Sequence, residues 1–266
     1  MQSLKKRRLL QAPFLLLAFW LVGASLAFGD CAATRIDQSA RAVQVLDGDT
    51  LRLVSGRKLR LIGVNAPELN TSQGAEPLAA EARRFVQQFV EKAGILQLRY
   101  GAEKEDRYGR LLVHVFDSAG KSLEQVLLEQ GLAFHITVGR NDALQDCLRR
   151  AEESARQKRL GVWDKPYYQA APPGALQEGF RLVQGAVQNV VLPNRGSWWL
   201  DLDSGVSLVI RPRDQSHFRK TDLLALQGRT VEARGWLIKR KGGKKTERRN
   251  PWLMPLSHGG MIEATK

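Results

Sequence analysis

Three short segments in the first half of the chain bring carboxylates together with arginines. They are Val45-Leu46-Asp47-Gly48-Asp49-Thr50-Leu51, the stretch from Leu59 to Glu68, and Asp106-Arg107-Tyr108-Gly109-Arg110. Carboxylates bind hard metal ions or accept protons, and the planar fork of an arginine matches two phosphoryl oxygens. Taken singly, an Asp-Gly-Asp sequence is typical of a turn, and an arginine on a strand usually faces solvent. The occurrence of all three segments in one chain favours a functional site instead.

These segments fall in a region whose pattern predicts a small β barrel with helices. Short runs separated by Asp-Gly-Asp and Ser-Gly turns predict strands, and apolar spacings of three and four residues predict helices. The predicted strands are Ala42–Leu46, Thr50–Val54, Lys58–Ile62, Ile95–Tyr100 and Arg110–Phe116, and the predicted helices are Ala75–Ala93, Leu123–Gln130 and Asp142–Leu160. This order indicates an α+β fold, with a closed antiparallel barrel of OB type packed on helices.

A second β region follows a stretch that contains Pro and Gly. Residues 170–178 predict a linker between a domain at residues 30–169 and another at residues 179–266. Beyond the linker the predicted strands are Phe180–Leu192, Ser197–Leu202, Val206–Ile210, Thr230–Ile238 and Trp252–Leu256, with a predicted helix at Gln215–Leu226. That order of elements is typical of a second, small OB-like barrel, and a generic β sandwich is the alternative.

The three carboxylate and arginine motifs resemble those of the staphylococcal (micrococcal) nuclease family, the thermonuclease-like domain. The resemblance runs from about Arg41 to Trp163 and continues through Glu129-Gln130-Gly131-Leu132-Ala133 and Leu160-Gly161-Val162-Trp163. It implies an OB barrel with helices and a calcium-dependent phosphodiesterase that acts on DNA and RNA.

The resemblance also implies roles for the motif residues. Glu68 is expected to be the general base that positions or deprotonates a water molecule. Arg60 and Arg110 are expected to hold the phosphate and its developing negative charge. Residues 134–139, which read Phe-His-Ile-Thr-Val-Gly, lack the tyrosines that stack on the nucleotide in well-known members. Base preference is therefore not transferred to this chain.

A calcium site is implied by the same resemblance. Asp49 is expected to be a metal ligand supported by Asp47, and a site without His or Cys ligands suits Ca²⁺ better than zinc. Asn65 stands where the best-known members resemble one another in having a second metal-binding Asp, and Ala66 can offer its backbone carbonyl. The lost negative charge at Asn65 predicts weaker calcium binding or an altered metal preference.

The first 29 residues have the pattern of a secretory signal peptide. A basic start is followed by an apolar stretch from Leu9 to Phe28 and by small residues at its end. Cleavage after Ala27 or Gly29 predicts an exported protein, periplasmic or secreted, without stable membrane insertion; an uncleaved anchor helix is the alternative. In an oxidising compartment, Cys31 and Cys147 either pair or remain free thiols.

Most of the net charge of +14 lies near the C-terminus, with +4 in residues 1–29, +2 in residues 30–173 and +8 in residues 174–266. A basic run lies between the last two predicted strands, where OB folds usually bind oligonucleotides. Tryptophans in the same domain either stack on bases or fill its core. The basic residues are Lys239, Arg240, Lys241, Lys244, Lys245, Arg248 and Arg249, and the tryptophans are Trp198, Trp199, Trp236 and Trp252. We expect nucleic-acid binding here, with a lipid or polysaccharide surface, or solubility alone, as alternatives.

The sequence thus predicts an exported, calcium-dependent endonuclease that hydrolyses phosphodiester bonds of DNA and/or RNA. The alternative is a non-catalytic nucleic-acid-binding module of the cell envelope with a degenerate metal site. A third hypothesis is a structural role in the envelope. No motif implies a protein partner.

Overall fold

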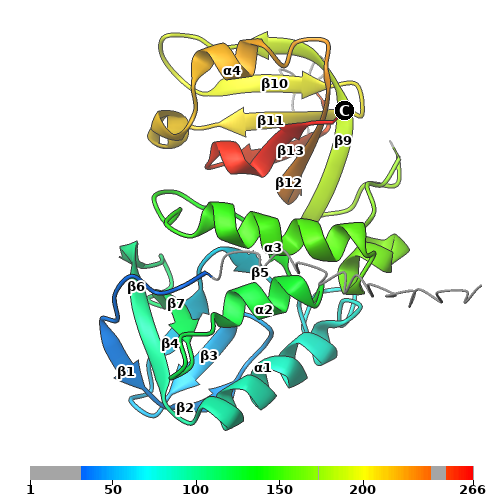
Figure 1. Ribbon diagram of the computed structural model, residues 1–266. Coiled ribbons are helices and arrows are strands. Elements are labelled where there is room, and N and C mark those ends of the chain that lie inside the picture. Colours follow the sequence, from blue (N-terminus) through cyan, green and yellow to red (C-terminus); the bar gives the residue numbers. More distant parts are fainter. Residues whose placement is uncertain (1–30, 173, 241–249, 266) are drawn as a thin grey trace, which may run out of the picture.

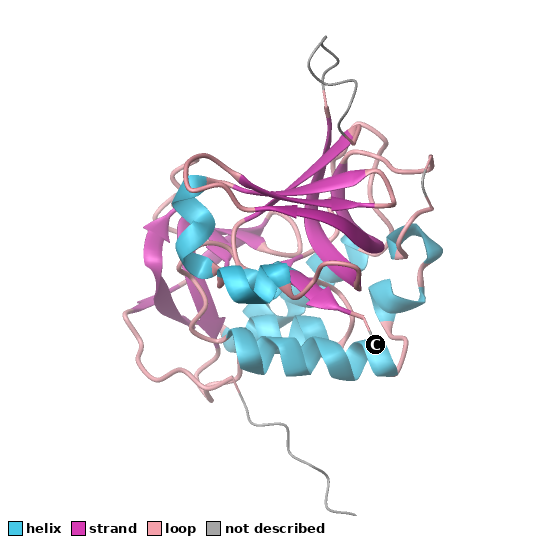
Figure 2. Cartoon of the chain, turned by 90° about the horizontal axis from the view of Figure 1, so that it is seen from above, coloured by secondary structure: helices cyan, strands magenta, loops and turns pink. Residues whose placement is uncertain are grey.

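The computed structural model describes residues 31–172, 174–240 and 250–265. They form two β barrels with helix α3 (Gln145–Gln157) between them (Figure 1). Figure 2 shows the strands and helices of the same chain from above. The predicted signal peptide, residues 1–29, lies outside the described residues. Within the described ranges, no helix is long and apolar enough to span a bilayer.

One bent strand closes the first barrel. The strands are β1 (Gln38–Ala40), β2 (Ala42–Val45), β3 (Thr50–Leu53), β4 (Lys58–Leu61), β6 (Leu96–Glu105) and β7 (Leu111–Phe116), in the order β1-β6-β7-β4-β3-β2. Because only Arg41 separates β1 from β2, the two ends of this order are one stretch of chain. The OB-type barrel is confirmed. The prediction that it is wholly antiparallel is wrong, because the chain crosses from β4 to β6 and returns as β7, which makes β7 parallel to β4.

The alternation of β4 decides where its arginine points. Leu59 and Leu61 are buried in the core of the barrel, whereas Arg60 between them is only partly buried. Successive side chains of a strand face opposite sides, so burial of the two leucines directs Arg60 away from the core. The alternation of β4 thereby holds Arg60 on the outer face of the barrel.

The helices that cover the first barrel are shorter than predicted. They are α1 (Ala79–Ala93), α2 (Leu123–Glu129) and α3 (Gln145–Gln157), followed by two short 3₁₀ segments, η1 (Gly161–Asp164) and η2 (Pro166–Tyr168). α1 begins after Pro77 rather than at Ala75, because the residue before a proline avoids the helical region and Leu78 has a φ of 69°. Its buried face, which includes Ala82, Val86 and Val90, packs against the barrel core.

A two-stranded sheet that the sequence analysis did not predict lies beside the first barrel. β5 (Val64–Asn65) pairs with β8 (Phe134–His135), with Asn65 opposite Phe134. All four of these residues are buried. The pairing fixes the backbone on which Asn65 stands.

The second barrel repeats the strand order of the first. Its strands are β9 (Gly179–Val191), β10 (Trp198–Leu202), β11 (Val206–Ile210), β12 (Thr230–Lys239) and β13 (Trp252–Leu256), with β14 (Ile262–Ala264) added to β12. β9 pairs with both β10 and β12, and β13 pairs with both β11 and β12, so the ring is closed. The third and fifth strands of the ring, β11 and β13, are parallel, as β4 and β7 are in the first barrel.

The predicted helix at Gln215–Leu226 is wrong as a single element. The structure has a 3₁₀ segment, η3 (Pro212–His217), and then a short helix, α4 (Lys220–Leu224). Phe218 and Arg219 between them have extended backbone angles, which end one element and allow the next to begin.

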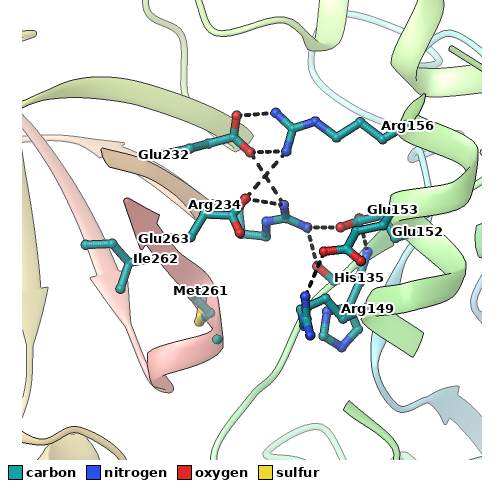
Figure 3. Close-up of a pocket in the computed structure, with 11 residues that line it drawn as sticks. His135, Arg149, Glu152, Glu153, Arg156, Glu232, Arg234, Met261, Ile262 and Glu263 are labelled. Atoms are coloured by element: carbon teal, nitrogen blue, oxygen red, sulfur yellow. Dashed lines mark hydrogen bonds and ion pairs between the residues drawn. The ribbon is translucent and has the colours of Figure 1, made fainter. Parts of the chain in front are cut away.

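Ion pairs and aromatic rings join the two barrels. Arg156 on α3 binds both carboxylate oxygens of Glu232 on β12, at 2.9 and 2.6 Å, and Arg234 lies 2.5 Å from Glu152 of α3 (Figure 3). Nearby, Phe134 packs against aromatic rings from both sides of the interface at centroid distances of 5.1 to 5.3 Å, namely Trp163, Tyr168 and Phe180. This combination of charge pairing and apolar packing fixes the second barrel against α3.

A disulfide ties the start of the described chain to the same helix. Cys31 pairs with Cys147 of α3, with their Cα atoms 5.6 Å apart. Of the two alternatives left by the sequence, pairing and free thiols, the structure has the pair.

Candidate active site

Arg60 is the centre of a buried group of polar contacts beside the first barrel. Its Nη2 lies 3.1 Å from Oδ2 of Asp49 and 3.3 Å from Oδ1 of Asn65. Its Nη1 donates to the backbone carbonyls of Leu61 and Val64, at 2.7 and 2.8 Å. Since both terminal nitrogens, Nη1 and Nη2, have partners and the side chain is only 12% exposed, the guanidinium is held in one orientation.

The Asp-Gly-Asp turn presses closely against α1. Oδ1 of Asp47 accepts a hydrogen bond from the backbone N–H of Asp49, and Oδ2 of Asp49 accepts one from the N–H of Ala66. A Cβ atom at Gly48 would lie 2.5 Å from Cβ of Ala66 and 2.8 Å from Cβ of Ala82. Only glycine allows the turn to lie this close to Ala66 and Ala82. The close packing fixes the position of the turn and of the two carboxylates that it carries.

Glu68 stands at the start of a loop that is closed by two hydrogen bonds. Its backbone N–H donates to Oε2 of Glu76 at 2.9 Å, and its carbonyl accepts from the N–H of Glu76 at 2.8 Å. Glu68 itself is exposed, and it follows the buried residues Ala66 and Pro67. The loop therefore offers the Glu68 side chain to solvent from a backbone that is fixed at both ends.

Arg110 is aligned by the hairpin turn before β7. Its Nε donates to Oδ2 of Asp106 at 2.7 Å, and Oδ1 of Asp106 accepts the backbone N–H groups of Tyr108 and Arg110. Partial burial raises the pKa of Asp106, but these hydrogen bonds outweigh it and leave the pKa below its ordinary value. The Arg110 guanidinium also lies 5.6 Å from the ring centroid of Tyr108, which is 67% exposed.

The predicted residues form one electrostatic group. Desolvation and then the negative charge of Asp47 raise the pKa of Glu68, whereas Arg60 and Arg110 lower it. Burial likewise raises the pKa of Asp49 to about 7, against the opposing effect of Arg60. The charges of Asp47, Arg60 and Arg110 thus act on Glu68, and those of Asp47, Arg60 and Glu68 act on Asp49. The group has more carboxylates than guanidiniums.

The comparison with known proteins agrees with this geometry. Residues 58–165 match the family model described as Staphylococcal nuclease homologue. The first barrel therefore resembles the staphylococcal nuclease family. The match begins at β4, so it includes Arg60, Glu68 and Arg110 but starts after the Asp-Gly-Asp turn.

Three curated relatives each match less than half of the chain. Endonuclease YncB of Bacillus subtilis (strain 168) is 32% identical over 131 residues, 47% of this chain and 61% of that protein. The SPbeta prophage-derived endonuclease YokF of the same organism is 29% identical over 47% of this chain and 44% of its own length. Staphylococcal-like nuclease CAN1 of Arabidopsis thaliana is 34% identical over 40% of this chain and 29% of its length. The chain therefore spans less than two thirds of these three relatives.

The nuclease family is generally calcium-dependent, and the oxygen donors beside Arg60 suit a hard cation. Oδ2 of Asp49 and Oδ1 of Asn65 face the same nitrogen of Arg60, so a carboxylate and an amide oxygen lie together. Burial is the main cause of the raised pKa of Asp49, and the negative charges of Asp47 and Glu68 add to it against the opposing effect of Arg60. A cation beside Asp49 would favour its charged form. Among the described residues, no group of three or more His, Cys, Asp or Glu side chains is arranged as a metal site.

The predicted nucleic-acid-binding residues of the second barrel are described only in part. Lys239 lies 6.0 Å from the ring centroid of Trp252, and Arg240 lies 5.6 Å from that of Trp199. Trp198 is buried in the barrel core, so of the two alternatives left by the sequence, stacking and core filling, this tryptophan has the second. Lys241, Lys244, Lys245, Arg248 and Arg249 lie outside the described residues.

Sequence analysis missed three residues next to the nuclease-family site. Glu76 closes the Glu68 loop, and its Oε1 accepts a hydrogen bond from the Tyr167 hydroxyl and lies 3.7 Å from Nη1 of Arg181. No local pattern connects these positions, because Tyr167 follows the range matched by the family model and Arg181 belongs to β9 of the second barrel. Only the folded interface brings them to the loop.

Proposed function

We propose that this protein is an exported, calcium-dependent endonuclease that hydrolyses phosphodiester bonds of DNA and/or RNA. The observation that carries the proposal is the convergence of Arg60, Arg110 and Glu68 in one electrostatic group beside Asp49. Phosphodiester hydrolysis needs a base for water and positive charge for the developing phosphorane, and this group contains both. The family match and the relatives named endonucleases support the same reaction class.

In this mechanism, Glu68 orients the attacking water and accepts its proton at a carboxylate oxygen. Arg60 and Arg110 contact the non-bridging phosphate oxygens, where fixed donors stabilise charge that grows in the transition state. The contacts of Arg60 with backbone carbonyls and of Arg110 with Asp106 hold both guanidiniums in place before substrate arrives. Asp49, Asn65 and the Ala66 carbonyl would hold calcium, which when bound supplies positive charge to the phosphate.

Replacement of Glu68 tests the assignment of the base. Glu68→Gln removes the proton acceptor but keeps the size of the side chain, and kcat is expected to fall by about 10²- to 10⁴-fold. Glu81→Gln, at an exposed position in the first turn of α1, is the matched control and should retain wild-type kcat. Cleavage of labelled DNA and RNA by the Glu68 variant at the wild-type rate would show that the mechanism is wrong.

Chelation tests the proposed metal separately. Activity should disappear in excess chelator and return with added Ca²⁺, because Arg60 and Arg110 together do not balance the three carboxylates of the site. Full activity in chelator contradicts the calcium assignment while leaving the nuclease assignment intact.

One observation favours a second candidate, a nucleic-acid-binding module without catalysis. The Asp49 carboxylate already accepts hydrogen bonds from Thr50 and Ala66 and contacts Arg60, which leaves it few free lone pairs. Binding of labelled DNA without turnover, at every Ca²⁺ concentration tried, would select this candidate.

Export and nucleic-acid retention complete the proposal. The Cys31–Cys147 disulfide supports an oxidising compartment, where such bonds persist. The basic charge of residues 174–266 supports a role of the second barrel in holding the substrate, through Lys239, Arg240 and the basic residues that follow them. Periplasmic or culture-medium localisation of the tagged chain, and a salt-dependent KM, are the expected observations.

A further inference from the structure

Two successive tyrosines and one arginine hold the loop that carries Glu68. The Tyr167 hydroxyl donates to Oε1 of Glu76 at 3.2 Å, and the Tyr168 hydroxyl donates to the carbonyl of Pro77 at 2.6 Å. Both tyrosines belong to η2, the short 3₁₀ segment that follows the first barrel. The end of the loop is thus anchored by the chain that leads to the second barrel.

Arg181 brings the second barrel into the same contact. Its Nη1 lies 3.7 Å from Oε1 of Glu76, donates to the carbonyl of Phe180 at 2.7 Å, and its guanidinium lies 5.2 Å from the ring centroid of Tyr167. The side chains of Arg181 and Glu76 are 12% and 10% exposed. A buried carboxylate of this kind needs a charge partner, and removal of the partner leaves it uncompensated.

The Glu76 carboxylate therefore connects two parts of the molecule. One oxygen faces Tyr167 and Arg181, and the other accepts the backbone N–H of Glu68. Without Arg181, hydration favours a Glu76 carboxylate that turns toward water. The backbone N–H of Glu68 then loses its hydrogen-bond acceptor. The ion pair of Arg234 on β12 with Glu152 of α3 and the packing of Phe134 on Phe180 keep β9 in position for this contact.

We propose that Arg181 of the second barrel is a positioning residue, which acts through Glu76 to hold the loop that presents Glu68. This role rests on the proposed nuclease function, in which Glu68 acts on the attacking water. The second barrel then contributes to the chemical step as well as to substrate retention. A nuclease-like domain without β9 lacks this contact.

Kinetics of the full chain test the role in catalysis. Arg181→Met keeps the apolar stem and removes the charge, and kcat on a labelled single-stranded DNA with Ca²⁺ is expected to fall by about 10- to 100-fold at unchanged KM. Arg181→Lys restores the charge and should recover most of kcat. Arg156→Met is the matched control: it breaks an interface ion pair with Glu232, which keeps Arg234 and Gln184 as partners, and should leave kcat unchanged.

Amide hydrogen exchange tests the positioning role independently of activity. The Glu68 N–H should exchange at least about tenfold faster in Arg181→Met than in wild type or Arg156→Met, because its acceptor is no longer held. In a Glu76→Gln background, Arg181→Met should add little further effect, since the two residues act in one chain of contacts. An unchanged Glu68 exchange rate in Arg181→Met overturns the inference.

The two proposals fail in distinguishable ways. A wild-type chain that cleaves neither DNA nor RNA in Ca²⁺ sinks the nuclease function, and hydrogen exchange still decides whether Arg181 holds the loop. A wild-type chain that cleaves, together with an Arg181→Met variant of wild-type kcat, sinks the catalytic consequence of Arg181 alone.

Discussion

Acidification is expected to destabilise this protein through His135, which lines the cavity between the barrels with Arg149 and Arg234 (Figure 3). The side chain is 4% exposed, and within the described chain its Nε2 has no hydrogen-bond partner. Desolvation, and then the positive charges of Arg234, Arg149 and His258, lower the pKa of His135 to about 3. The folded protein therefore holds this imidazole neutral.

The sign of the effect follows from proton linkage. Because the pKa of His135 is lower in the folded than in the unfolded state, the unfolded chain binds more protons as the pH falls. The contribution to stability is fully present above the unfolded pKa of 6.5 and is lost as the pH falls toward 3. Between about pH 7.5 and about pH 5, a group with these two pKa values removes about 2 kcal/mol from the free energy of unfolding.

Urea unfolding of the wild type and of His135→Gln at the two pH values measures this contribution. Glutamine is neutral and polar but does not titrate, so the variant should lose about 2 kcal/mol less than the wild type on acidification. The difference between the two proteins removes most of the effect of other titrating groups. Equal losses in both proteins would refute the argument that burial beside Arg234 keeps His135 neutral.

Two substitutions in the active-site group test two different properties, calcium affinity and the free energy of unfolding. Asn65→Asp restores a carboxylate beside Asp49 and should tighten Ca²⁺ binding by roughly tenfold in calorimetric titration, and weaker binding would contradict the placement of the ligand. Gly48→Ala places a methyl group 2.5 Å from Cβ of Ala66 and 2.8 Å from that of Ala82. It should cost about 1–3 kcal/mol of unfolding free energy, and unchanged stability would show that the turn can move away from α1.

Local patterns predicted the features that depend on local structure. Alternation along β4, with Leu59 and Leu61 buried, already indicates that Arg60 leaves the barrel wall, and the turn residues mark where Asp47 and Asp49 stand. The order of strands and turns also indicated both barrels, because each OB-type ring is built from neighbouring hairpins and one crossover.

Features that depend on distant contacts were not predictable in this way. The pairing of Asn65 with Phe134 joins two very short segments whose composition does not identify a sheet. The contact of Arg181 with Glu76 depends on the docking of β12 on α3 through the Arg234–Glu152 ion pair, and no periodicity encodes which charges meet there.

Helix α3 carries both the disulfide and the ion pairs that hold the second barrel. Cys147 belongs to the helix that also carries Glu152 and Arg156, the first-barrel side of the ion pairs with β12. Covalent closure to Cys31 and docking of the second barrel thus both require the same helix in the same place. Thermodynamic coupling is reciprocal, so docking makes the disulfide harder to reduce by the same free energy with which the disulfide strengthens docking. Reduction of the Cys31–Cys147 disulfide and docking of the second barrel on α3 are therefore coupled equilibria.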